Sequence, residues 1–160
     1  SWKSKYKNVT LVAIVGYFIF TLIRMVNLHP YEYIYYNEFT GGVKGASKYF
    51  EIEYWGAAYK ESAQYVLKVV KENSIKKPKV YACDNQFAVV YYSQFQYDLQ
   101  FRSKDADFII CDIFKENLRI ETNRDFYKDT HPIVKTINRE GVPIHNIRIR
   151  KDLIDSLILK

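Results

Sequence analysis

The most apolar stretch of the chain lies close to its N-terminus. Residues 9–23 carry no charge, and the 20 residues from 9 to 28 contain a single charged side chain, Arg24. At about 1.5 Å per residue, a helix of that length spans about 30 Å, the thickness of a bilayer core. Pro30 disfavours helix at the residue before it, so a transmembrane helix ending near Leu28 is predicted. A buried core helix and a signal peptide are the alternatives, although no small-x-small cleavage site follows the apolar run.

The charges around this run predict its orientation. Lys3, Lys5 and Lys7 precede it, and positively charged flanks stay on the cytoplasmic side. Arg24 and Lys44 on the far side weaken the asymmetry without reversing it, and Arg24 is long enough to snorkel to the headgroups. We therefore expect a protein of the plasma or inner membrane, with lipid as a partner and the rest of the chain extracytoplasmic.

A tyrosine-rich segment, residues 29–56, follows the apolar run, and we call it the collar. Tyr31, Tyr33 and Tyr35 alternate, so an extended collar would put three rings on one face. Aromatic belts form at the headgroups because the ring prefers the boundary while the hydroxyl reaches water. We expect these rings to face the headgroups or the membrane helix. The glycine-rich residues 41–45 predict a loop, but they do not match the phosphate-binding loop pattern.

The remaining residues, 57–160, alternate between helical and strand patterns. The first part predicts an amphipathic helix over 57–73, with Ala63, Val66, Leu67 and Val70 on one face. Later patterns predict a strand at 79–83, a helix over 86–95 capped by Asp84 or Asn85, a short strand at 98–101, a strand at 107–111 and a hairpin across Glu140-Gly141. A helix over 132–139 competes with the first strand of that hairpin, and residues 151–160 give no clear pattern.

The order of these elements predicts the fold class. Buried apolar strands separated by a helix favour an α/β layer with parallel pairing. We predict an α/β fold in three parts: a flank and transmembrane helix at 1–28, the collar at 29–56, and a small mixed α/β sandwich domain at 57–160 that ends in a β-hairpin.

Composition narrows the possible partners. Of the 160 residues, 48% are hydrophobic and 17% aromatic, including 15 tyrosines, and the formal net charge is +6. That charge favours anionic partners such as lipid headgroups or sugar phosphates, although on charge alone a solvated lysine-rich surface is the preferred interpretation. Nucleic acid is not expected, because the basic residues are scattered and no recognisable binding motif is present.

The cysteines and histidines do not form a known metal or disulfide pattern. Cys83 and Cys111 are too few for a disulfide framework, and the three histidines lack zinc-ligand spacing, so no metal is expected. Cys83-Asp84 and Cys111-Asp112 each close a predicted strand, which is where α/β sheets bind ligands. The simpler interpretation is that the cysteines are small core residues and the aspartates cap the segments that follow.

Two features of the collar suggest binding chemistry. Glu51 and Glu53 would form a carboxylate pair on one face of an extended segment. Such a pair can act in acid–base chemistry or bind a metal, but more often it is simply solvated. Trp55 is a flat ring that either stacks on a sugar or packs in a core.

The collar and the start of the next helix read "HPYEYIYYNEFTGGVKGASKYFEIEYWGAAYKESAQYV". This resembles the protein-O-mannosyltransferase type of membrane glycosyltransferase, in the multi-span GT-C class, many bacterial members of which look like "HPYxYxYYN…GG…GA…YWG…YKEA" after their last span. The matching positions are His29, Pro30, Tyr31, Tyr33, Tyr35, Tyr36, Asn37, Gly41, Gly42, Gly45, Ala46, Tyr54, Trp55, Gly56, Tyr59, Lys60 and Glu61. Ser62 departs from the commoner alanine.

The resemblance implies an enzyme with many spans that transfers a sugar from a polyprenyl-phosphate donor to a glycan, lipid or protein acceptor outside the cytoplasm. The catalytic carboxylate of that family lies in an early loop, so no catalytic residue and no cofactor are assigned to this chain. The chain begins with Ser rather than Met, so a processed product or a piece of a longer protein is expected, packed against upstream transmembrane helices. Such a piece alone should transfer no sugar.

The residues expected to contact the sugar or the lipid phosphate are Tyr36, Asn37, Glu53 and Trp55. Asn offers a donor and an acceptor, Glu accepts from hydroxyls, and Trp offers a stacking face. The competing interpretation is structural, with Trp55 plugging the start of the 57–72 helix and Asn37 capping a turn. Two other functions stay open: a stand-alone membrane-anchored α/β binding module without catalysis, and a soluble enzyme whose site is Asp84 and Asp112.

Overall fold

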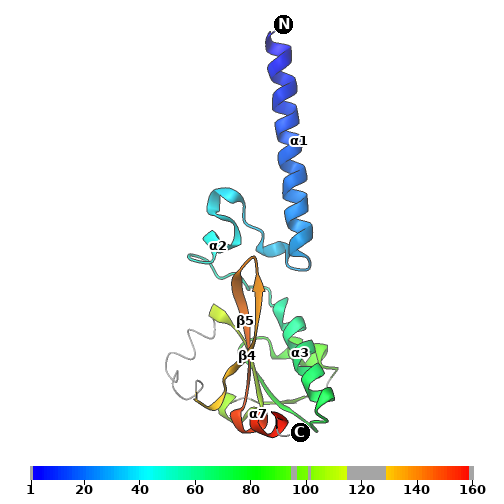
Figure 1. Cartoon of the computed structure of the whole chain (residues 1–160), viewed down its shortest axis with the longest axis vertical. Helices are drawn as coiled ribbons and strands as arrows, with labels where there is room; N and C mark the ends of the chain where they lie inside the picture. The colour runs from blue at the N-terminus through cyan, green and yellow to red at the C-terminus, as the bar shows by residue number, and fades with distance from the viewer. Residues whose placement is uncertain (1, 95–96, 101, 115–128, 159–160) are drawn as a thin grey trace.

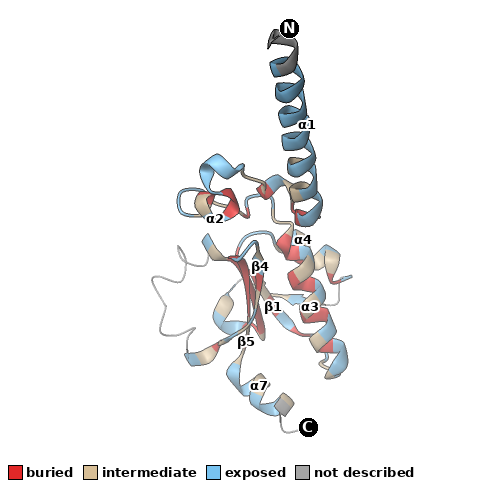
Figure 2. Ribbon diagram, turned by 45° about the horizontal axis from the view of Figure 1, so that its top comes forward, coloured by how far each residue is buried: buried red, intermediate tan, exposed pale blue. Residues whose placement is uncertain are grey.

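A long helix stands out from an α/β domain, and the collar lies between them (Figure 1). The computed structural model describes residues 2–94, 97–100, 102–114 and 129–158. Helix α1 spans Trp2–Leu28, so it ends where Pro30 predicted. Its large apolar side chains from Val9 to Ile23 are exposed, which makes the interpretation as a buried core helix wrong (Figure 2). The segment Tyr6–Leu28 is long and apolar enough to cross a membrane.

The collar is wound into short turns rather than extended. Two 3₁₀ turns, η1 (Glu32–Ile34) and η2 (Glu38–Thr40), precede the short helix α2 (Gly42–Ala46). The N–H of Tyr31 donates to the carbonyl of Leu28 at 2.7 Å, so the chain turns back as soon as α1 ends. The predicted row of three rings on one face is therefore wrong.

The collar glycines have a steric explanation. Gly41 has a φ of 80°, in the left-handed region that side chains with a Cβ rarely adopt. At Gly45 a Cβ would collide with the carbonyl of Thr40. The glycine-rich loop is thus required for tight backbone packing, independently of any ligand.

The domain after the collar is a five-stranded mixed sheet with helices. Its elements are α3 (Ala58–Glu72), β1 (Lys79–Ala82), α4 (Gln86–Tyr92), β2 (Asp98–Leu99), η3 (Ser103–Asp105), β3 (Phe108–Asp112), β4 (Ile133–Arg139), β5 (Val142–Ile149) and α7 (Lys151–Ile158). The strand order is β2-β1-β3-β5-β4, with β1 parallel to β2 and β3, and β5 antiparallel to β3 and β4. The α/β prediction and the C-terminal hairpin are confirmed, and the competing helix over 132–139 is wrong.

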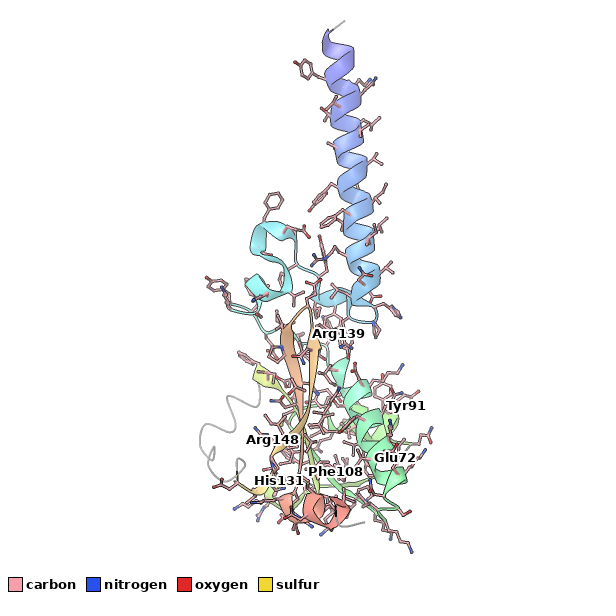
Figure 3. The ribbon with its side chains drawn as sticks, in the orientation of Figure 1. Glu72, Tyr91, Phe108, His131, Arg139 and Arg148 are labelled. Carbon is pink, nitrogen blue, oxygen red and sulfur yellow. A yellow bond between two sulfur atoms is a disulfide. The ribbon has the colours of Figure 1, made fainter. Side chains whose placement is uncertain are left out.

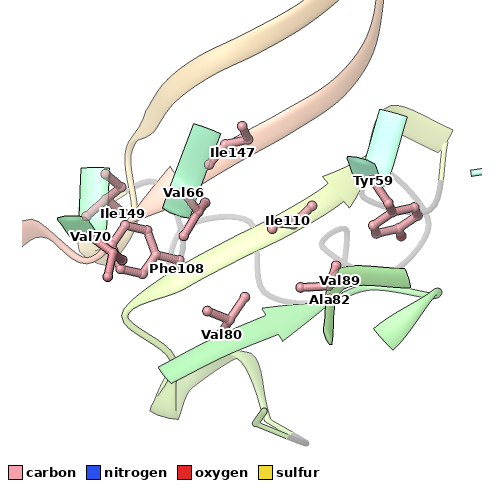
Figure 4. Packing of buried hydrophobic residues seen from close by; sticks show 10 residues of the cluster. All are labelled: Tyr59, Val66, Val70, Val80, Ala82, Val89, Phe108, Ile110, Ile147 and Ile149. Carbon is pink, nitrogen blue, oxygen red and sulfur yellow. The ribbon is translucent and has the colours of Figure 1, made fainter. Parts of the chain in front are cut away.

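The main core lies between α3 and one face of the sheet (Figure 4). Val66 and Val70 of α3 pack in the same cluster as Phe108 and Ile110 of β3, all of them buried. These two valines belong to the predicted apolar face of that helix. Of the unassigned C-terminal residues, those from Lys151 to Ile158 form α7, whose Leu153 packs against this cluster.

A second buried cluster joins the collar to the domain. Leu28 at the end of α1 and Tyr31 and Ile34 of the collar pack with Ile137 of β4 and Ile144 of β5. Tyr31 is thus a core residue that packs with the end of α1, so of its two expected environments the helix is correct and the headgroups are not. Burial of its ring stabilises the attachment of the collar to the hairpin.

Candidate functional site

A cavity of about 140 Å³ opens where the parallel strand β3 ends beneath the collar. Its lining comes from the collar, the end of β3 and the start of β5: Ser47, Phe50, Glu51, Ile52, Glu53, Asp112, Ile113, Phe114, Val142, Pro143 and Ile144. The carboxyl ends of parallel strands are where α/β sheets bind ligands. Three carboxylates from the sequence-based candidates, Glu51, Glu53 and Asp112, therefore line one cavity, while the fourth candidate, Asp84, is exposed and is not part of this lining.

Glu53 is the most firmly held of the predicted contact residues. Glu53 is only 6% exposed, and its carboxylate accepts hydrogen bonds from the Ala58 N–H at 2.8 Å and from the hydroxyl of Tyr33. Ala58 begins α3, whose N-cap residue Ala57 supplies no side-chain cap, so Glu53 satisfies one of the orphan donors of that helix. Burial raises the pKa of Glu53, although the two hydrogen bonds oppose this. Glu53 therefore has a clear structural role at the cavity wall.

Arg139 connects three elements at the side of the collar that faces the domain (Figure 3). Its guanidinium lies 4.0 Å from the centroid of the Tyr31 ring and forms an ion pair with Glu61 of α3. The Tyr31 hydroxyl donates to the same Glu61 carboxylate at 2.9 Å. Burial raises the pKa of Tyr31, so this hydroxyl stays protonated as a donor. The collar, the hairpin and α3 are thus held in one arrangement.

A second ion pair reaches the long apolar helix α1. Arg24 of α1 lies 2.5 Å from Glu140 at the tip of the β4–β5 hairpin. A Cβ on Gly42 would lie 3.8 Å from both Arg24 Nη2 and Glu140 Oε2, so the start of α2 packs beside this pair. The sequence predicted a snorkelling arginine and gave no sign of this partner, which is 116 residues away in the chain.

The other three predicted contact residues lie outside the lining of this cavity. Tyr36 stacks on Phe50, a cavity residue, with ring centroids 5.9 Å apart. Asn37 caps η2 by accepting the Thr40 N–H, which confirms the structural interpretation of Asn37. Trp55 is 73% exposed and meets Tyr54 edge to face, so the idea that it plugs the start of α3 is wrong. Trp55 and Asn37 are not among the residues that line the cavity.

The two cysteines form a disulfide, which sequence reasoning missed. Cys83 directly follows β1 and Cys111 lies in β3, with their Cα atoms 5.0 Å apart. The register of the parallel pair brings Ala82 beside Ile110, so the next residues along both strands are the two cysteines. The signal was available: each cysteine ended a predicted strand, and parallel neighbours end at the same edge of a sheet.

His145 is a buried residue that the sequence did not single out. It is fully buried in β5, its Nδ1 lies 2.8 Å from the Ser62 hydroxyl, and its ring meets Tyr59 edge to face at 4.4 Å. Burial lowers the pKa of His145 to about 3. The histidine is therefore neutral in the folded protein over the physiological pH range.

This burial predicts acid sensitivity. In the unfolded protein His145 takes up a proton near its ordinary pKa of about 6.5, whereas in the folded protein its pKa is about 3. Its contribution to stability is therefore present above about pH 6.5 and is lost as pH falls toward 3. Each pH unit within that window should cost about 1.4 kcal/mol from this group. A His145→Asn variant should lose this part of the slope in pH-dependent unfolding, whereas the exposed-site change His29→Gln should keep it. Equal slopes in wild type and His145→Asn would contradict the assignment.

Among the described residues, no group of three or more His, Cys, Asp or Glu side chains is arranged to hold a metal ion. The cavity instead combines carboxylates with two aromatic rings, Phe50 and Phe114, and aliphatic side chains. Carboxylates accept hydrogen bonds from hydroxyls and rings pack on apolar faces, so a small hydroxylated group fits this chemistry.

No protein-family model matches the chain, and neither the curated proteins nor the solved structures contain a match.

Proposed function

We propose that this chain is the C-terminal part of a membrane glycosyltransferase of the GT-C class, which passes a sugar from a polyprenyl-phosphate donor to an acceptor outside the cytoplasm. Helix α1 is its last membrane span. The α/β domain contributes no catalytic residue and instead assists binding of the donor or the acceptor, or stabilises the enzyme.

The proposal depends on what the residues that resemble this family do in the structure: some hold the collar in place, and others are exposed. Tyr31 and Glu61 both bond to the network around Arg139, and Gly45 is required for a close backbone approach. This segment accordingly supports a folded junction between an apolar helix and the carboxyl edge of a sheet. Tyr54 and Trp55, by contrast, are exposed and are supported only by their contact with each other among the ring pairs described. Exposed aromatic rings with no packing role suit contact with a ligand.

Two features support an extracytoplasmic domain. Lys3, Lys5 and Lys7 lie before the span, as expected for a cytoplasmic N-terminus. Disulfides persist in oxidising compartments and are rare in the cytosol, which favours the outer side for Cys83–Cys111.

The test uses the complete enzyme and its Trp55→Ala variant. Because Trp55 is exposed, the substitution should leave folding stability within about 0.5 kcal/mol of wild type. If the ring contacts donor or acceptor, KM for one of them should rise about tenfold, equivalent to about 1.4 kcal/mol of binding. Transfer of a radiolabelled sugar from a polyprenyl-phosphate donor measures both the reaction and KM.

Tyr91→Ala is the matched control, since Tyr91 is 69% exposed and also meets its neighbour, Tyr92, edge to face. It should change neither stability nor KM. An enzyme that transfers sugar normally with Trp55→Ala would remove Trp55 from the site. A complete protein that transfers no sugar from any such donor would favour the alternative of a membrane-anchored binding module.

A further inference from the structure

Several aromatic side chains of the collar are exposed, and the most exposed of them, Phe39, lies on the turn η2. The turn η2 rises next to the last turns of α1 rather than lying flat on the domain (Figure 1). Phe39, at the middle of this turn, is 92% exposed, while Tyr31 in the same collar is buried. The ring most available to lipid is therefore not one of the three tyrosines that the sequence pattern selected.

The position of this turn along α1 follows from the contacts of Arg24, Gly42 and Asn37. Arg24 lies one helical turn, about 6 Å, before the end of α1 at Leu28. The start of α2 packs beside the pair of Arg24 and Glu140, as the position of Gly42 shows. The N–H of Gly42 donates to the carbonyl of Asn37 at 3.1 Å. This hydrogen bond ties the residue that precedes η2 to the start of α2, beside Arg24. Phe39 is thus carried by a loop anchored at the depth of Arg24.

On a membrane-spanning α1, Arg24 marks the level of the headgroups, because its guanidinium cannot lie in the hydrocarbon core without a large cost. A phenylalanine carried at that level meets the boundary between headgroups and acyl chains. Burying an exposed Phe side chain contributes about 1.5–3 kcal/mol, whereas leaving it in water contributes nothing. A lipid bilayer is the occupant that a membrane-spanning α1 would bring to the level of this ring.

We infer that the collar is a second membrane contact, in which Phe39 inserts into the headgroup–acyl boundary of the bilayer. Together with α1 it attaches the α/β domain at two points, which fixes the tilt of the domain over the membrane. This inference rests on the membrane-spanning part of the proposed function and is independent of sugar transfer.

Spin labels on introduced cysteines test the inference, since the native cysteines are paired and buried. The full chain is reconstituted in vesicles of phosphatidylcholine and phosphatidylglycerol, with single labels at Phe39→Cys, Val12→Cys or Phe87→Cys. Val12 lies within α1, and Phe87 at the start of α4 is 89% exposed and so matches Phe39 in exposure. Accessibility to oxygen, which concentrates in lipid, is compared with accessibility to a water-soluble nickel chelate.

We expect position 39 to reverse the ratio seen at position 87, with oxygen favoured over nickel as at position 12. A label at 39 that favours nickel while position 12 favours oxygen would overturn the inference and leave the membrane span intact. A label at 39 reached by neither reagent would also overturn it, because Phe39 would then pack against protein. If position 12 itself favours nickel, the membrane span fails and the inference fails with it.

Discussion

Replacing both Cys83 and Cys111 by alanine is expected to lower the free energy of unfolding by about 3–4 kcal/mol. The disulfide joins residues 28 apart in sequence, and closing a loop of that size removes conformational entropy from the unfolded chain. It also ties the carboxyl ends of β1 and β3 together beside the cavity. Chemical denaturation of the detergent-solubilised protein measures the loss, and adding a reductant should destabilise wild type but leave the double variant unchanged.

The same bond reports on the compartment. In cells, trapping of free thiols before lysis should leave Cys83 and Cys111 unmodified, whereas trapping after reduction and unfolding should modify both. Free thiols in the native membrane would remove the disulfide and, with it, one of the two supports for an extracytoplasmic domain.

Strand and helix patterns predicted the domain well because local burial dictates them. The buried residues of α3 recur at helical spacing, and β3 is buried along its whole length, as expected of a parallel strand covered on both faces. The hairpin across Glu140-Gly141 was recognisable from its turn, and Gly141 has the positive φ that such turns require.

The collar could not be predicted in the same way, because its conformation depends on distant partners. Alternating tyrosines are equally compatible with a strand and with turns, and the choice is made by the pocket that receives Tyr31 between α1 and the hairpin. The partners of Tyr31, Glu61 and Arg139, come from α3 and β4, and contacts between such distant residues leave no periodic pattern in the sequence. From a single sequence the residues of such a junction can be recognised, but their contacts with one another cannot be predicted.

The candidate site shows the same division. The pair Glu51 and Glu53 was singled out separately from Asp112, and only the fold brings the three to one cavity. Glu53 was expected to contact substrate, yet its carboxylate is already used by a backbone N–H and a tyrosine hydroxyl. Whether it has a second role is decided by separating its effects on stability and on activity.

Replacing Glu53 by alanine is expected to cost about 2–5 kcal/mol of folding stability. The change leaves the buried Ala58 N–H and the Tyr33 hydroxyl without their acceptor, and each unsatisfied donor costs about 1–3 kcal/mol. Glu53→Gln keeps an oxygen acceptor of the same shape, so it should restore most of the stability at neutral pH. Glu38→Ala, at an exposed collar carboxylate, is the control and should stay within about 0.5 kcal/mol of wild type.

The pH dependence of folding stability distinguishes wild type, with its carboxylate at position 53, from Glu53→Gln. Because burial raises the pKa of Glu53 above its unfolded value, the folded state binds the proton more tightly than the unfolded state. The resulting stabilisation is fully present below the unfolded pKa of about 4.3 and is lost as pH rises through the folded pKa. Wild type should therefore gain stability relative to Glu53→Gln as pH falls through this range, measured as the difference between their denaturation curves.

A constant difference would mean that the folded environment does not perturb Glu53. A loss below about 1 kcal/mol in Glu53→Ala would mean that its two hydrogen bonds contribute little. If Glu53→Gln folds like wild type but fails in sugar transfer, the charge of Glu53 acts on the substrate in addition to holding the start of α3.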